Sequence, residues 1–129
     1  WLARRRAHTR HFDTRGAYLD RVLATSGLTR TGLSAADRHD IGLAVHEPVV
    51  DVYGNAETID ALVAQLRLRP AASGNLTLRA VADLPAGLAD YVLDRQIMPV
   101  SVVAVDLMDS PEPRTAKAGL EIVQGLVHG

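Results

Sequence analysis

The 27 residues from Pro99 to Gly125 constrain the fold of this chain more than any other stretch. They hold an apolar run at 100–108, an acidic break with two prolines, and then an amphipathic segment. The β-branched residues of the apolar run favour a strand, whereas its continuation into Asp106, Leu107 and Met108 favours a buried helix. We choose the helix, because Pro99 suits a first-turn position and a later proline can start the next helix. The stretch therefore predicts two C-terminal helices that pack together and close a small domain.

A strand, a helix and a second strand are predicted between residues 49 and 81. Residues 49–53 are mostly β-branched and end at a Gly-Asn turn, and residues 76–81 alternate apolar and polar side chains as a half-buried strand does. Between them, residues 56–67 place apolar side chains on one helical face, with Asn55 as the expected N-cap. This is a βαβ-sized unit, and the sequence leaves the strand directions open. The expected fold class is therefore α+β, a small mixed sheet packed by helices.

Three further segments have weaker signals. A helix is expected over 15–24, capped by Asp13 or Thr14. A short helix is expected from Ser34 until Gly42 stops it. Residues 84–87 are predicted as a loop, and residues 88–95 as a short helix or strand.

Composition limits the class of protein. A chain of 129 residues is long enough for one domain, and its aromatic content of 4% means that the core must be aliphatic. Without cysteine it can form neither disulfides nor thiolate metal sites. No apolar stretch reaches the roughly 18 to 20 residues of a membrane span, and no signal peptide is recognisable. We expect a soluble, cytoplasmic protein without membrane contact.

The charge of the chain is split between its two ends. Residues 1–30 carry a balance of +5, and the remaining residues a balance of −6. Arg4, Arg5, Arg6 and Arg10 form the densest cluster, and guanidinium groups bind phosphate oxygens bidentately. We therefore expect these four arginines to contact nucleic-acid phosphates. Residues 1–14 are interpreted as a basic linker or the end of an upstream helix, in a fragment of a longer protein, and residues 15–129 as a single α/β regulatory or interaction domain.

No set of residues predicts catalysis or metal binding. His8 and His11 have a spacing seen in zinc sites, but no third and fourth ligand is evident. Arg38-His39-Asp40 places a base beside a carboxylate without a nucleophile in reach, and Ser73-Gly74-Asn75 lacks the lysine of a phosphate loop. We expect no catalytic residue, no metal and no cofactor, and hence no enzyme. A pocket with convergent titratable groups would keep an enzyme in consideration.

Four segments, taken in order, resemble the C-terminal region of AbiEi-type antitoxins and related actinobacterial winged-helix transcriptional regulators. The most specific of them has an aspartate-leucine pair, a short acidic break, proline-arginine and a final helix. The four segments are RTGLSAA (30–36), VVDVYG (49–54), LRLRPAASGNLTL (66–78) and DLMDSPEPRTAKAGLE (106–121).

The resemblance implies a function for the chain. In that family an N-terminal winged helix binds operator DNA, and the C-terminal domain contributes to antagonism of a nucleotidyltransferase-like toxin. This chain contains no complete winged helix, so the resemblance implies DNA binding through a missing N-terminal domain, helped by the basic segment. We therefore expect a non-catalytic C-terminal domain of a transcriptional regulator, an antitoxin of a toxin-antitoxin system acting by protein–protein contact and autoregulation, with a homodimer as one open assembly state. The alternative is a small-molecule-sensing domain, with its pocket between the βαβ unit and the C-terminal helices.

Overall fold

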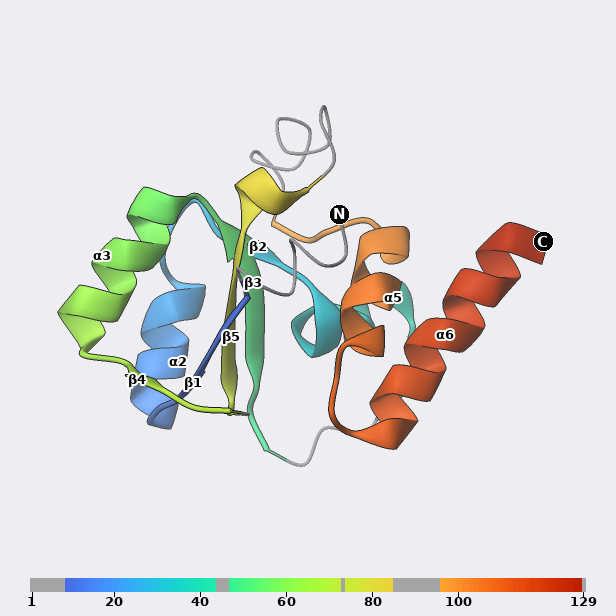
Figure 1. The fold of residues 1–129 in the computed structure, drawn as a ribbon, viewed down its shortest axis with the longest axis horizontal. Helices are drawn as coiled ribbons and strands as arrows, with labels where there is room; N and C mark the ends of the chain where they lie inside the picture. The colour runs from blue at the N-terminus through green and yellow to red at the C-terminus, as the bar shows by residue number, and fades with distance from the viewer. Residues whose placement is uncertain (1–8, 44–46, 73, 85–95, 129) are drawn as a thin grey trace.

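The computed structural model describes residues 9–43, 47–72, 74–84 and 96–128. They form a mixed α+β domain built on a five-stranded sheet, as the sequence predicts (Figure 1). The strands are β1 (Arg10–Asp13), β2 (Thr29–Arg30), β3 (Val50–Gly54), β4 (Arg69–Pro70) and β5 (Leu76–Ala80). The α-helices are α2 (Gly16–Leu23), α3 (Ala56–Leu66), α5 (Val100–Met108) and α6 (Pro113–His128).

The sheet has the strand order β2-β3-β5-β1-β4. Strands β3 and β5 are parallel and α3 connects them, so the expected βαβ unit is present and its strand direction is fixed. The other pairs are antiparallel. The register places Asp51 beside Thr77, and Thr77 beside His11, in one row across three strands. Polar side chains from the middle of the sheet are thereby brought together.

Helices cover both faces of the sheet (Figure 1). On one face, α2 and α3 pack against the side chains of alternate strand residues, such as Val52 and Leu78. On the other face lies a second core, in which α5 packs around Tyr53 and Met98. Helix α6 packs along α5, so the two C-terminal helices pack together as the sequence predicts.

Several predicted elements agree closely with the structure. Asn55 caps α3, because its side-chain oxygen accepts a hydrogen bond from the Thr58 amide at 2.8 Å. The helix predicted for the run after Pro99 is α5. At α6 the first-turn donors are satisfied by Glu112, which accepts hydrogen bonds from the Arg114 amide and from the amide and hydroxyl of Thr115. The Thr115 hydroxyl bond, followed by these amide bonds, lowers the pKa of Glu112.

Three predictions need correction. The segment from Ser34 to Gly42 is not an α-helix but forms two 3₁₀ turns, η1 (Gly32–Ser34) and η2 (Ala36–His39), because Asp40 ends the second in a left-handed conformation. Helix α2 begins without a side-chain cap, so neither Asp13 nor Thr14 caps it. Residues 10–13 belong to the sheet as β1, inside the segment 1–14 that the sequence predicts as a linker. The loop and element expected over 84–95 lie, apart from Leu84, outside the described residues.

Candidate functional site

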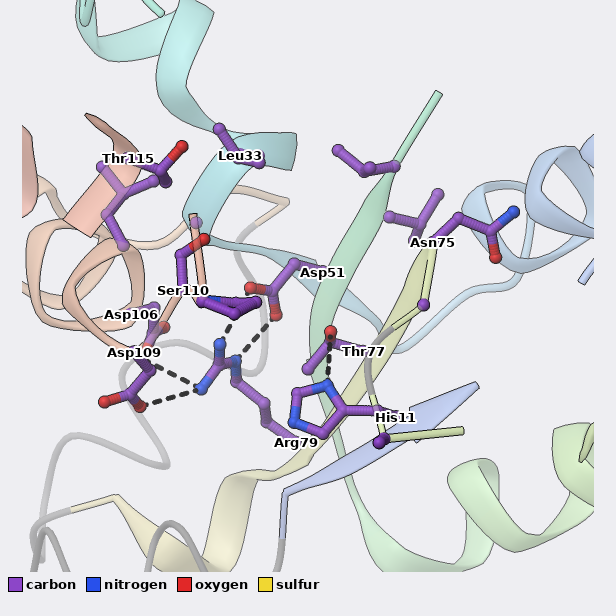
Figure 2. A pocket seen from close by; sticks show the side chains of 17 residues that line it. His11, Leu33, Asp51, Asn75, Thr77, Arg79, Asp106, Asp109, Ser110 and Thr115 are labelled. Carbon is purple, nitrogen blue, oxygen red and sulfur yellow. Dashed lines mark hydrogen bonds and ion pairs between the residues drawn. The ribbon is translucent and has the colours of Figure 1, made fainter. Parts of the chain in front are cut away.

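The face of the sheet that α5 covers carries polar side chains instead of a continuous apolar surface. Because strand residues alternate between faces, Asp51 and Tyr53 on β3 share this face with Thr77 and Arg79 on β5. On β1, His11 joins them, and its Nδ1 lies 3.2 Å from the Thr77 hydroxyl oxygen. Figure 2 shows these side chains directed towards the end of α5.

Arg79 is the centre of this group. It is 4% exposed, and its guanidinium donates two hydrogen bonds to Asp51, from Nε to Oδ1 at 2.7 Å and from Nη2 to Oδ2 at 2.9 Å. Its third nitrogen, Nη1, lies 3.5 Å from Asp106 Oδ1 and 3.6 Å from Asp109 Oδ2. Within the described part of the chain, Nη1 has no hydrogen-bond partner. Arg79 therefore links the central sheet to the C-terminal end of α5.

Electrostatics fix the charge of Arg79. Burial disfavours a charged group and would lower the pKa of Arg79. The charge of Asp51 and its hydrogen bonds outweigh this, with smaller effects from Tyr53 and Asp109, so that the pKa of Arg79 is raised above its ordinary value. The guanidinium is thus a permanent cation.

Asp106 is a buried carboxylate on an otherwise apolar helix. Its Oδ1 accepts a hydrogen bond from the Tyr53 hydroxyl at 3.1 Å, and its Oδ2 accepts a short hydrogen bond from the Thr31 hydroxyl. A buried charge is retained only when partners replace its hydration. Thr31, Tyr53 and Arg79 supply that replacement from three different parts of the chain.

Local backbone structure positions Asp51. The Ser34 hydroxyl oxygen accepts a hydrogen bond from the Asp51 amide at 2.8 Å and donates one to the Val49 carbonyl at 3.2 Å. Gly32 lies over the Asp51 side chain with a φ of 52°, and a Cβ at this position would overlap the carboxylate. Glycine is needed here both for its positive φ and for the room that it leaves.

A pocket of about 250 Å³ lies against this cluster, between the βαβ unit and the α5–α6 turn (Figure 2). Arg79, Asp51, Asp106 and Asp109 all line it, so at neutral pH its wall carries one positive and three negative charges. Such a wall disfavours anions and suits ligands that donate hydrogen bonds or carry positive charge. Because the pocket gathers titratable groups, it has the property that keeps an enzyme in consideration.

The four segments that carry the family resemblance meet at this pocket. Each contributes to the lining, and every lining residue except His11 and Arg79 comes from one of them. These segments are far apart in the sequence, and only the fold brings them together.

The candidate phosphate-contact residues lie elsewhere. Arg4, Arg5 and Arg6 are outside the described residues, as is His8. Arg10 is described, and its guanidinium is exposed, lies 3.2 Å from Asp60 and stacks 5.4 Å above the ring of Phe12. A phosphate at Arg10 would therefore compete with Asp60.

The described residues offer neither a metal site nor a membrane span. Among them, no group of three His, Cys, Asp or Glu side chains is arranged to hold a metal ion. None of the described helices is both long and apolar enough to cross a membrane. Comparisons with protein-family models, curated proteins and solved structures find no match.

Proposed function

We propose that this chain is a non-catalytic C-terminal domain of a DNA-binding transcriptional regulator, an AbiEi-type antitoxin that acts in the cytoplasm. The observation that carries the proposal is that the four segments of the resemblance converge on one pocket. Segments that match a family in order, and also meet in space, are expected to serve one shared role. In this proposal the role is contact with a partner, a nucleotidyltransferase-like toxin, while an upstream winged helix reads the operator.

The absence of catalysis is part of the proposal, and the state of the charged groups supports it. Asp51 is held by Arg79 in a bidentate pair, and Asp106 is held by two hydroxyl groups and Arg79. Groups that are committed to one another stabilise the junction of sheet and helices and are poorly placed to transfer protons. The Arg79 cluster is then a structural connection beneath a binding surface.

The regulator proposal predicts DNA binding with a defined salt dependence. The intact protein should shift DNA that contains its own promoter at low salt. Replacing Arg4, Arg5 and Arg6 with glutamine should reduce the slope of log K against log salt by about one unit for each phosphate-binding arginine removed. If the intact protein shifts no promoter DNA at low salt, the proposal loses its basis. A nucleotidyltransferase-like reading frame directly downstream would support the toxin as partner.

A small-molecule-sensing domain is the second candidate function, and the position of the pocket favours it. The pocket lies between the βαβ unit and the C-terminal helices, where a ligand could alter the packing of α5 and α6 against the sheet. A ligand at 100 times its Kd that binds only the native state adds about 2.7 kcal/mol to the free energy of unfolding. A thermal-shift screen with metabolites that carry amines or several hydroxyl groups should then show a stabilising compound.

A pocket-filling variant makes this screen specific. Ala72 is exposed and lines the pocket, so Ala72→Trp should block the ligand and abolish the stabilisation. Ala24→Trp, at the exposed end of α2, is the matched control and should keep it. A stabilisation that survives in Ala72→Trp would place the ligand outside this pocket.

A further inference from the structure

A second cleft, of about 570 Å³, lies at the β4 edge of the sheet, where α2 begins and α3 ends (Figure 1). Leu66 and Leu68 are buried in its floor. Arg15, Arg67 and Arg69 line it, with Asp13 as the one acidic lining residue. We refer to it as the arginine cleft.

The three arginines reach the cleft from separate elements. Arg15 directly precedes α2, and Arg67 directly follows α3. Arg69 lies on β4, opposite Asp13 in the strand register. All three residues are exposed, and in the described part of the chain none of their guanidinium groups has a hydrogen bond or an ion pair.

Arg67 occupies an unusual backbone position. It has φ 50° and ψ 49°, the left-handed conformation that follows many helices, and the Leu68 amide donates to the Val63 carbonyl as in a Schellman motif. Glycine is the usual residue there, because a side chain strains this conformation. A positive charge at the end of a helix offsets part of that cost. The backbone thus holds the start of this side chain in a fixed direction beside the cleft.

The chemistry of the arginine cleft fits phosphate. Three cations and one carboxylate give it a net charge of +2, in a chain whose net charge is −1. Guanidinium forks without acidic partners are free to bind phosphate oxygens bidentately. None of the exposed large apolar side chains of the described residues lines the cleft, so it lacks the apolar anchors of a membrane-binding surface.

The cleft also lies beside the basic segment. Arg10, the last arginine of that segment, and Asp13, in the cleft wall, are at the two ends of β1. Three residues of strand span about 10 Å, which is within the reach of a single duplex. We propose that Arg15, Arg67 and Arg69 bind the phosphate backbone of a nucleic acid, so that a duplex held by the basic segment continues along the β4 edge. The inference extends the proposed function, because it gives this domain its own DNA contact.

The test measures binding of this chain to a 20-base-pair duplex of arbitrary sequence by fluorescence anisotropy between 50 and 200 mM salt. Replacing Arg15, Arg67 and Arg69 together with glutamine should lower the log–log salt slope by about 2.7, at about 0.9 for each contact. The matched control replaces the exposed residues Arg38, Arg114 and Lys117 with glutamine, which removes the same charge from other surfaces. The control should retain most of the wild-type slope.

Two further measurements protect the test against misfolding and against other anions. Arg67→Gly suits the left-handed backbone, so it should fold at least as well as the wild type and still lower the slope by about 0.9. In NMR titrations, the duplex should shift the amide signals of residues 14–18 and 66–69 at concentrations where inorganic phosphate and anionic vesicles do not. Equal slopes for the two triple variants, or equal or stronger responses to phosphate or vesicles, would overturn the inference.

The two DNA proposals fail separately. If the duplex binds through the arginine cleft but the intact protein does not recognise its promoter, the cleft stands and the regulator proposal falls. If the promoter shifts and the cleft variant binds like its control, the regulator proposal stands and the cleft is a solvated surface.

Discussion

Replacing Arg79 with leucine should lower the free energy of unfolding by about 3–5 kcal/mol at pH 7, the usual cost of removing one partner from a buried ion pair. Asp51 would lose both of its guanidinium hydrogen bonds, and Asp106, which has no exposed side-chain surface, would lose its positive neighbour. The hydroxyl groups of Thr31 and Tyr53 can hydrogen-bond the Asp106 carboxylate but cannot neutralise it. The substitution therefore leaves an uncompensated buried charge, which costs more than the removal of a single hydrogen bond.

The pH dependence of this effect has a definite sign. A cation whose pKa is raised in the folded state contributes stability below its unfolded pKa, and this is lost only as pH rises through the folded value. Because the pKa of Arg79 is raised from an already high value, its contribution does not titrate between pH 4 and pH 10. In Arg79→Leu, protonation of the unpaired carboxylates at low pH relieves the uncompensated charge. We therefore expect the difference from the wild type to shrink between pH 7 and pH 4.

Urea denaturation at pH 7 and pH 4 measures both effects. Arg79→Lys keeps the charge but cannot form the bidentate pair with Asp51, so it should fall between leucine and the wild type. Arg38→Leu, at an exposed position, should change the free energy of unfolding by less than about 0.5 kcal/mol. If Arg79→Leu costs under about 1 kcal/mol, the cluster does not hold the helices to the sheet.

How far the sequence predicts the fold depends on the range of the interactions involved. Helix α3 is predictable because Asn55 caps it and its apolar face is local to the segment. Strands β1 and β4 are not, because they are short and are defined by pairing across the sheet. In β1 only Phe12 is apolar, so the strand has no pattern to detect. The 3₁₀ turns at 32–39 resemble an α-helix in sequence, because their small residues suit a helix start equally well.

The candidate site is only partly predictable from the sequence. Alternation in the two parallel strands places Asp51 and Arg79 on one face, but it equally describes a face exposed to solvent. Asp106 is the available signal. A charged residue inside an otherwise apolar helical run needs a buried partner, and Arg79 is the buried strand cation that supplies one. Which helix covers this face depends on packing between segments far apart in the chain.

Replacing Gly119 with alanine should destabilise the domain by about 1–3 kcal/mol, the usual cost of overpacking. Gly119 faces α5 at the closest approach of the two C-terminal helices. A Cβ there would overlap the Ala104 carbonyl oxygen and lie 2.9 Å from both Leu107 Cβ and Met108 N. Two of these three atoms belong to the α5 backbone, so relief requires the helices to separate.

Gly125 is a control in the same helix. A Cβ there meets no atom within 4 Å, so Gly125→Ala should gain about 0.5–1 kcal/mol from helix propensity alone. The two substitutions are chemically identical, and they should change the midpoint of urea denaturation in opposite directions. If Gly119→Ala also stabilises the protein, the close packing of α5 and α6 is not rigid.

The Gly119 substitution also tests how the helix pair is coupled to the buried cluster. Asp106 and Asp109 lie in and directly after the part of α5 that Gly119 touches, so moving α5 should draw both carboxylates away from Arg79. The free-energy changes of Gly119→Ala and Arg79→Leu should then add to more than that of the double variant, by at least about 0.5 kcal/mol. Additive changes would mean that the helix pair and the cluster stabilise the domain independently. Coupling would identify α5 as the element through which anything bound in the adjoining pocket could act on α6.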